Sequence, residues 1–384
     1  MSINESILII SLIGVSYSYF LYPFILLSFP KKQTDLTLNK HVSADNDLPF
    51  ITFIITAYNE ASRIKQKIHN TLEIDYPQDK REILVASDGS TDNTNQYVEE
   101  FAAQGIRLIK VKERKGKENA QLAAIREAKG EILIFSDVAT QIPAEAVKIM
   151  ASTFTNPEIG AVSSEDRFIT ADGSIAGEGA YVKYEMWLRR LEAKVKSLVG
   201  LSGSFFACRK TICKNWDITV PSDFNTALNC VSQGYIAVSH PEVLGYYPNI
   251  KDESKEYQRK LRTVIRGMAA ISSKPMVLNP FRFGFFAIEV LSHKIMRWLV
   301  PWFMLTLLIA SITLWQQHFI YKLLLAAELS FYMLAVTGWL IKSTRSMSLI
   351  KLPFFFMQVN IAIAHAGIQF ITGKRITMWE PSKR

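Results

Sequence analysis

Three carboxylates mark a candidate chemical site in this chain. Each lies where an apolar run ends and turn residues begin. Glu60 closes the sequence Ala-Tyr-Asn-Glu, Asp88 begins Asp-Gly-Ser-Thr-Asp, and Asp137 follows a serine. Carboxylates hold divalent cations that neutralise diphosphates, and a carboxylate can also take the proton of a hydroxyl nucleophile. Turns use aspartate freely, so one such residue is weak evidence. Three of them, with a Lys-Gly-Lys sequence at 115–117 in between, predict a site for a phosphate-rich ligand.

The elements around these carboxylates alternate between short apolar runs and segments with helical periodicity. This alternation predicts an α/β domain with a mostly parallel, Rossmann-like sheet that is covered on both faces. Ligands of such sheets bind outside the carboxyl ends of the strands, where these carboxylates would lie. Strands are predicted at 50–57, 82–86, 106–111 and 131–135, and helices at 59–72, 91–103 and 117–128.

Further along the chain, a fourth carboxylate stands at the start of a predicted helix. A charged helix is predicted at 177–195, and a Gly/Ser turn at 200–204 leads into a strand. A helix then opens at Ser222-Asp223 and runs to about residue 232. Ser222 or Asp223 is placed to cap this helix.

Together these residues resemble the family 2 glycosyltransferases, the inverting group that includes cellulose, hyaluronan and poly-N-acetylglucosamine synthases. The resemblance covers about residues 48–275 and implies a GT-A fold and a nucleotide-sugar donor, expected to be a UDP-sugar. The matching sequences, in chain order, are Thr-Ala-Tyr-Asn-Glu at 56–60, Ser-Asp-Gly-Ser-Thr-Asp at 87–92, Lys-Gly-Lys at 115–117, Ser-Asp at 136–137, Gly203 and Ser-Asp at 222–223.

The resemblance also implies a role for each matching residue. Asp88 would hydrogen-bond the nucleotide base, Lys117 would approach the base or the diphosphate, and Asp223 would be the catalytic base. Asp137 matches the first Asp of the family's Asp-x-Asp motif and would bind Mg²⁺ or Mn²⁺. The residues expected to line the nucleotide are Ala57, Tyr58 and Glu60, with Arg262 meeting the diphosphate; Gly203 and Trp379 are candidate acceptor contacts.

Two positions depart from the family's pattern. The second Asp of Asp-x-Asp is Ala139 here, so metal binding would depend on Asp137 and the phosphates. Because Mg²⁺ commonly keeps several waters, a metal requirement is still expected. The Trp of the processive synthases' Gln-x-x-Arg-Trp motif is replaced by Thr263 after Arg262. This replacement argues against long-chain processive synthesis.

Apolar segments at both ends predict a membrane protein. Residues 7–29 form 23 residues without a charge, roughly 34 Å of helix and enough to cross a hydrocarbon core. A cleaved signal peptide is disfavoured, because it needs a basic n-region and a small-residue cleavage site. Further runs occupy 298–315 and 319–341. The segment 353–372 carries a stripe of small and polar side chains and is expected to lie at the interface rather than to cross.

These boundaries give the expected domains. They are an anchor at 1–30, a linker at 31–47, a GT-A domain at 48–275, interfacial and transmembrane helices at 276–372, and a cytosolic basic tail at 373–384.

The positive charge lies beside the apolar runs rather than on the predicted domain. Residues 51–250 carry 23 basic and 25 acidic side chains, whereas 251–300 carry 10 and 4, and 342–384 carry 7 and 1. A nucleic-acid binder would place its positive charge on the folded domain, so nucleic acid is not an expected partner. The pattern instead follows the positive-inside rule and favours anionic lipids as partners. We therefore expect a multi-pass protein of the bacterial inner membrane with a cytosolic catalytic domain.

The favoured function is an inverting hexosyltransferase that adds one or a few sugars to a lipid-linked or polysaccharide acceptor in cell-envelope glycan synthesis. One alternative is a processive polysaccharide synthase. Another is a catalytically silent membrane scaffold that only binds nucleotide-sugars, which the retained Asp88, Asp137 and Asp223 disfavour. The three cysteines lack a CxxC spacing, which argues against a zinc site or a disulfide framework.

Overall fold

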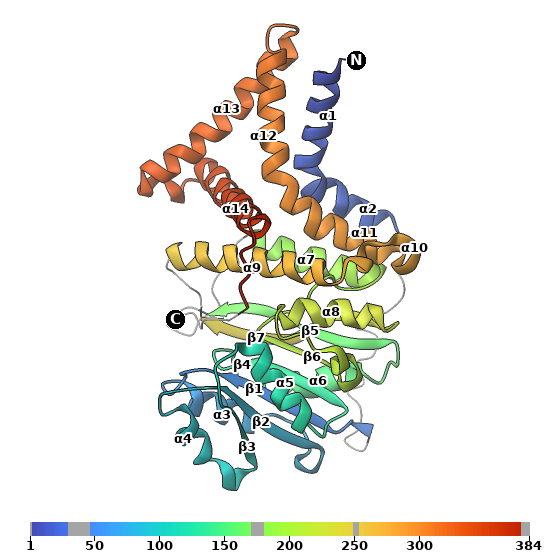
Figure 1. The fold of residues 1–384 in the computed structure, drawn as a ribbon, viewed down its shortest axis with the longest axis vertical. Coiled ribbons are helices and arrows are strands. Elements are labelled where there is room, and N and C mark those ends of the chain that lie inside the picture. Colours follow the sequence, from blue (N-terminus) through green and yellow to red (C-terminus); the bar gives the residue numbers. More distant parts are fainter. Residues whose placement is uncertain (1, 30–46, 170–179, 249–252, 378–384) are drawn as a thin grey trace. The chain divides into compact units, whose positions relative to one another are not determined.

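The computed structural model describes residues 2–29, 47–169, 180–248 and 253–377 (Figure 1). Most of the predicted linker and the candidate acceptor contact Trp379 lie outside the described residues. The chain divides into two compact units. We call residues 29–251, 269–287 and 376–384 the sheet unit, and residues 1–28, 252–268 and 288–375 the helical unit.

The sheet unit is built on one seven-stranded mixed sheet with the strand order β3-β2-β1-β4-β6-β5-β7. The first four strands of this order are parallel neighbours, whereas β6 runs antiparallel to both β4 and β5. The predicted α/β class with a mostly parallel sheet is therefore confirmed. The strands are β1 (Ile51–Ala57), β2 (Arg81–Asp88), β3 (Ile106–Val111), β4 (Ile132–Asp137), β5 (Ile159–Ile169), β6 (Phe205–Arg209) and β7 (Ile236–Pro248).

Helices cover both faces of this sheet, as the apolar strands require (Figure 1). Alternate residues of each central strand enter two separate cores: Phe53 and Ile55 of β1 face one core, and Ile54 faces the other. The first core is closed by α3 (Ile64–Leu72), α4 (Thr94–Glu99) and α6 (Ala146–Thr153), and the second by α5 (Lys117–Glu127) and α8 (Ser222–Ser232).

The register of the central strands brings their carboxyl ends to one edge. Ala57 at the end of β1 pairs with Ser87 of β2, and Thr56 pairs with Asp137 of β4. We call this the carboxyl edge of the sheet. A later helix, α7 (Ala180–Val195), matches the charged helix predicted at 177–195 over its described residues.

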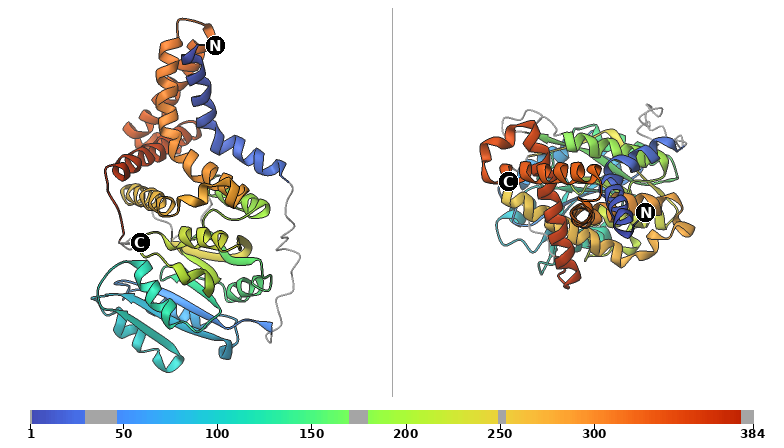
Figure 2. Two further views of the ribbon diagram at one scale, coloured as in Figure 1. Left: turned by 45° about the vertical axis from the view of Figure 1, so that its right-hand side comes forward. Right: turned by 90° about the horizontal axis from the view of Figure 1, so that it is seen from above.

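The helical unit contains long apolar helices in which α1 (Ile3–Ser16) packs against α12 (Met296–Leu314) (Figures 1 and 2). Leu8 enters a small core with Leu307 and Leu314, and the Ser11 and Thr306 hydroxyls are 2.7 Å apart. The unit also holds α13 (Phe319–Leu340), α14 (Ser348–Ile371) and the first part of α9 (Glu253–Ser273).

Among the described residues, four segments are long and apolar enough to cross a membrane. They are Ile3–Ser28, Phe285–Leu314, Phe319–Leu340 and Ser348–Ile371. The last contains the segment expected to lie at the interface, and its length and composition suit a crossing as well; the expectation stays a prediction. Glu328 of α13 accepts a hydrogen bond from the Ser311 hydroxyl of α12 at 3.0 Å, so this carboxylate faces a neighbouring helix.

Candidate active site

The turns that follow β1 and β2 are joined by side-chain hydrogen bonds to backbone groups. Asn59 has a left-handed backbone with a φ of 51°, and its side-chain oxygen accepts the N–H of Thr91 at 2.8 Å. The backbone N–H of Glu60 donates to the Thr94 hydroxyl at 2.8 Å. The asparagine of Ala-Tyr-Asn-Glu and the threonine of Asp-Gly-Ser-Thr-Asp therefore fasten the two motifs to each other at the carboxyl edge.

The first motif presents a charged and an aromatic side chain, each with a partner. The Glu60 carboxylate is buried and accepts from Nε and Nη2 of Arg63 at 2.9 and 2.6 Å. Burial raises the pKa of Glu60, and the charge of Arg63 opposes this effect. The Arg114 guanidinium lies 3.9 Å from the centre of the Tyr58 ring, the geometry of a cation–π contact. Ala57 ends β1 beside them and is buried.

Asp88 organises the loop before Lys117. Its two carboxylate oxygens accept the backbone N–H groups of Lys115 and Gly116, at 3.0 and 2.8 Å. The adjacent Gly89 has a φ of 66°, and a Cβ there would lie 2.9 Å from the Arg114 backbone nitrogen, so this turn requires glycine. The carboxylate predicted to bind a nucleotide base therefore also shapes the loop that positions the lysine.

Four of the predicted residues converge at the carboxyl edge. The Lys117 ammonium donates to Oδ1 of Asp137 at 2.5 Å and to the carbonyl oxygen of Gly203 at 2.8 Å. Gly203 also lies against Asp223, since a Cβ on this glycine would be 3.0 Å from Oδ2 of Asp223. Lys117 is buried and Asp137 is 24% exposed, so the pair lies at the wall of the site with the carboxylate open to solvent.

Asp223 does not cap its helix, so the prediction that it or Ser222 is the N-cap is wrong. The N-cap of α8 is Pro221, which places Asp223 in the first turn. The reason is that proline favours the extended conformation of a cap residue and the helix begins immediately after it. No hydrogen bond or ion pair with another described residue engages the Asp223 carboxylate. Within the part of the chain that the structure describes, this half-buried acid is therefore available to a ligand.

Glu118, a residue that the sequence analysis missed, links α8 to α5, the helix that begins at Lys117. Glu118 follows Lys117 and is buried, and its Oε1 accepts the backbone N–H of Ser222 at 3.4 Å. Its carbonyl oxygen accepts from the indole N–H of Trp216 at 3.0 Å. The start of α8, and with it Asp223, is thereby tied to the element that carries Lys117. No motif marks this role, because it depends on contacts between distant segments.

A second missed residue lies behind the turn that follows Asp137. The Lys67 ammonium of α3 is fully buried and donates to the carbonyl oxygen of Thr140 at 2.6 Å. Burial lowers the pKa of Lys67 to about 7, although the charge of Asp137 acts in the opposite direction. Asn70 bonds both backbone groups of Ile142. The sequence does offer a signal for Lys67: it is a lysine at a position where the helical pattern predicts an apolar residue.

The loop that contains Gly203 is hydrogen-bonded to a side chain of β5. Oδ1 of Asp166 accepts from the hydroxyls of Ser202 and Ser204 at 2.5 and 3.1 Å. Burial raises the pKa of Asp166 against the lowering effect of these hydrogen bonds. Its neighbour Glu165 is buried and pairs with Arg190 at 3.3 Å. Both acids of this strand are therefore engaged in supporting the loop and the adjacent helix.

Two predicted residues do not enter this description. Arg262 lies in α9, in the part that belongs to the helical unit, so its contact with a diphosphate stays a prediction. Trp379 lies outside the described residues, and its contact with an acceptor also stays a prediction.

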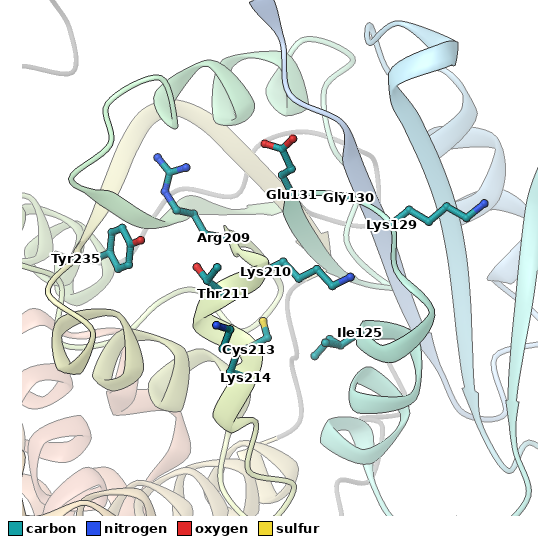
Figure 3. Close-up of a pocket in the computed structure, with 10 residues that line it drawn as sticks. All are labelled: Ile125, Lys129, Gly130, Glu131, Arg209, Lys210, Thr211, Cys213, Lys214 and Tyr235. Carbon is teal, nitrogen blue, oxygen red and sulfur yellow. The ribbon is translucent and has the colours of Figure 1, made fainter.

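A hollow lies at the other end of β4. It has a volume of about 580 Å³ and is lined mainly by residues 129–131, which precede β4, and by residues at the end of β6 and just after it, between 209 and 214 (Figure 3). Two of its cations are committed elsewhere: the Arg209 side chain donates to the carbonyl oxygens of Phe154, Asn156 and Ile159, and Lys210 donates to that of Ala128. None of the predicted site residues lines this hollow.

Comparison with known families identifies the domain that builds the carboxyl edge. The family model described as glycosyl transferase family 2 matches residues 52–216. By this match, residues 52–216 are similar to the family 2 glycosyl transferases. The match contains Glu60, Asp88, Lys117 and Asp137 and ends just before Asp223. The family 2 resemblance inferred from the motifs is therefore confirmed.

Curated relatives of this domain are polysaccharide synthases. The poly-beta-1,6-N-acetyl-D-glucosamine synthase of Staphylococcus epidermidis is 27% identical over 205 residues, which are 51% of this chain and 48% of that protein. The synthase of Staphylococcus aureus strain COL is 27% identical over 206 residues, 52% of this chain and 47% of that protein. The chain spans about half the length of the curated relatives that it matches.

A solved structure shares the fold over nearly the whole chain. The mannosyltransferase PcManGT from Pyrobaculum calidifontis, solved in complex with GDP-Man and Mn²⁺, aligns with a TM-score of 0.71 and 22% identity. The alignment covers 97% of this chain and all of that chain. At this identity the likeness shows the fold, and the family 2 domain here accordingly has the GT-A architecture.

Proposed function

We propose that this chain is a membrane-bound inverting glycosyltransferase that moves a sugar from a nucleotide-sugar to a glycan or lipid-linked acceptor. The observation that carries the proposal is the convergence of Lys117, Asp137, Gly203 and Asp223 at the carboxyl edge of a family 2 domain. The four candidate spans support attachment to a membrane. The basic side chains that flank them favour a cytosolic sheet unit, by the positive-inside rule.

The site divides the work of the transfer between its two halves. Asp88, Tyr58 and Glu60 line the part that would receive the nucleotide, and Lys117 would neutralise charge on the diphosphate leaving group. Asp223 would take the proton from the acceptor hydroxyl as that oxygen attacks the sugar carbon from the face opposite the diphosphate. An attack from the opposite face inverts the configuration of that carbon.

A divalent metal suits the residues present at Asp137. Its partly exposed carboxylate offers the oxygen that Mg²⁺ or Mn²⁺ prefers, and a nucleoside diphosphate supplies further oxygens. Among the described residues no three acidic, histidine or cysteine side chains gather into a ready-made cage, so the nucleotide would have to complete the coordination. The metal would stabilise the charge of the departing diphosphate. The Mn²⁺ in the mannosyltransferase complex supports this part of the proposal.

A processive synthase is the second candidate, and the named activity of the curated relatives favours it. Thr263, in place of a tryptophan that would stack on the growing glycan, argues against it. The two candidates differ in the length of the product made from one donor.

The decisive experiment incubates membranes that contain the protein with a panel of UDP- and GDP-sugars and measures the nucleotide released and the size of the glycan formed. We expect one donor to be used in the presence of Mg²⁺ or Mn²⁺ and products of one or a few added sugars. Long polymer would favour the processive candidate. If no donor were consumed and neither UDP nor GDP bound, the chain would be no transferase.

A further inference from the structure

The contact between Lys117 and Asp137 bears on how the proposed metal reaches its site. An ammonium group that donates at 2.5 Å to a carboxylate oxygen occupies a position of that oxygen where a cation would bind. The same ammonium donates to the Gly203 carbonyl oxygen, so two protein oxygens hold it. The carboxylate that would bind the metal is therefore already neutralised by a cation of the protein itself.

The surroundings of Asp137 offer nothing further to attract a free metal ion. Position 139 is alanine, so the turn lacks the second carboxylate that an Asp-x-Asp sequence would supply. The nearby Glu60 carboxylate is paired with Arg63. Lys67 lies behind the same turn and binds the Thr140 carbonyl oxygen. The positive charge of Lys117 next to Asp137 disfavours a bound cation and favours an anion.

We propose that Lys117 holds the cation position on Asp137 while the donor site is empty, so that a divalent metal binds only together with the nucleoside diphosphate. This inference rests on the proposed function, because it assumes that the diphosphate binds at the carboxyl edge. When the diphosphate arrives, its oxygens offer the Lys117 ammonium a new partner, and Asp137 becomes available to the metal that the same phosphates carry. Lys117 is thus a positioning residue that sets the order of binding.

The arrangement has a thermodynamic consequence. If the nucleotide draws Lys117 away from Asp137, the nucleotide must raise the affinity for metal, and the metal must raise the affinity for the nucleotide by the same factor. Removing the ammonium should uncouple the two events, because Asp137 would then be open to metal at all times. Lys117→Met should therefore strengthen the binding of metal alone while it weakens the binding of nucleotide.

The test measures Mn²⁺ binding directly, through the loss of the electron paramagnetic resonance signal of free Mn²⁺, with the full-length protein in a non-ionic detergent. We expect wild-type protein to bind stoichiometric Mn²⁺ only when UDP or GDP is present. Without nucleotide, Lys117→Met should bind Mn²⁺ roughly tenfold or more tightly than wild type, the scale of removing one adjacent like charge. Lys117→Arg keeps the charge and should behave as wild type.

The matched control is Lys110→Met, which removes an exposed ammonium that pairs with Glu99. It should leave Mn²⁺ binding unchanged. Stoichiometric binding of Mn²⁺ to wild-type protein without nucleotide, as tight as with it, would overturn the proposal whether or not the Lys117 variants fold. A wild-type protein that bound neither UDP nor GDP under any condition would instead overturn the proposed function.

Discussion

The two ends of β4 show how differently charged side chains can be used in one sheet. At its amino end lies the hollow of about 580 Å³, whose Arg209 and Lys210 donate to backbone carbonyl oxygens of neighbouring loops. At its carboxyl end the Lys117–Asp137 pair lies beside Asp223, a carboxylate that no other described residue engages. Arg209 and Lys210 of the hollow thus serve the fold, whereas we propose that the groups at the carboxyl edge exchange partners when a ligand binds.

The strongest test of this difference is Asp223→Asn. The amide keeps the shape of the side chain but cannot accept the acceptor's proton, so transfer should fall by about 10²–10⁴-fold, the usual worth of a general base. Because no other described residue bonds to this carboxylate, and a charge in the first turn of a helix typically contributes only about 0.3–1 kcal/mol, the thermal unfolding temperature and UDP binding should stay near wild type. The rate of sugar transfer and calorimetric UDP binding measure the two effects.

A near wild-type rate for Asp223→Asn with normal UDP binding would place the base elsewhere. Glu165 and Asp166 would be the next candidates. Both are already engaged, Glu165 by Arg190 and Asp166 by the hydroxyls of Ser202 and Ser204, so either would first have to give up a structural contact.

The next effect concerns Asp88. Its carboxylate accepts two backbone N–H groups, so Asp88→Ala should loosen the loop before Lys117 and remove a contact expected for the nucleotide base. UDP binding should weaken by about 1–3 kcal/mol, the cost of losing a charged hydrogen-bond partner. Calorimetry with UDP measures this effect. Unchanged affinity in a folded variant would remove Asp88 from the nucleotide site and weaken the contrast between the two ends of the sheet.

A smaller effect is expected at Gly203. A methyl group there would lie 3.0 Å from Oδ2 of Asp223, so Gly203→Ala should shift the carboxylate by a few tenths of an ångström. A base displaced from its hydroxyl loses rate, and we expect transfer to fall roughly tenfold with UDP binding retained. Gly105→Ala would be a poor control for this variant, because Gly105 has a φ of 84°, a conformation in which a side chain is strained. Gly245→Ala is the better control, because its Cβ would make only ordinary contacts of 3.5 Å.

The first half of the sheet could be predicted from the sequence because its strands are buried on both faces. Such strands are continuous apolar runs, and β1 to β4 lie within two residues of the predicted ranges. The strands β5 and β7 were missed. The interior of β5 carries three buried polar residues, Ser163, Ser164 and Glu165. Partners on α7 offset the cost of this burial: Arg189 donates to Ser163, and Arg190 pairs with Glu165. Strand propensity and hydrophobic periodicity give no information about such partners, which lie far away in the sequence.

The candidate site shows the same limit. Motif order was enough to propose Asp88, Lys117, Asp137 and Asp223 as a group, because strand ends in a parallel sheet share an edge. The sequence could not show that Lys117 donates to Asp137, since side-chain conformations depend on packing between distant segments. For the same reason it misplaced the cap of α8 and missed Lys67, whose contact with Thr140 joins residues 73 positions apart.

The smallest expected effect belongs to the hollow, and it is the one that could break the comparison outright. Lys129 points away from the other lining residues (Figure 3), and Lys214 is exposed at the end of a short helical turn. Replacing both by alanine removes two cations from the rim while leaving the carbonyl contacts of Arg209 and Lys210 intact. Exposed substitutions of this kind change stability by roughly 0.5 kcal/mol or less, and the site at the other end of β4 should not sense them. Transfer and UDP binding should therefore stay within about twofold of wild type, a change of roughly 0.4 kcal/mol.

If transfer instead fell tenfold in a well-folded double variant, the hollow would take part in binding a substrate. The distinction between structural cations at one end of the sheet and exchangeable groups at the other would then no longer hold.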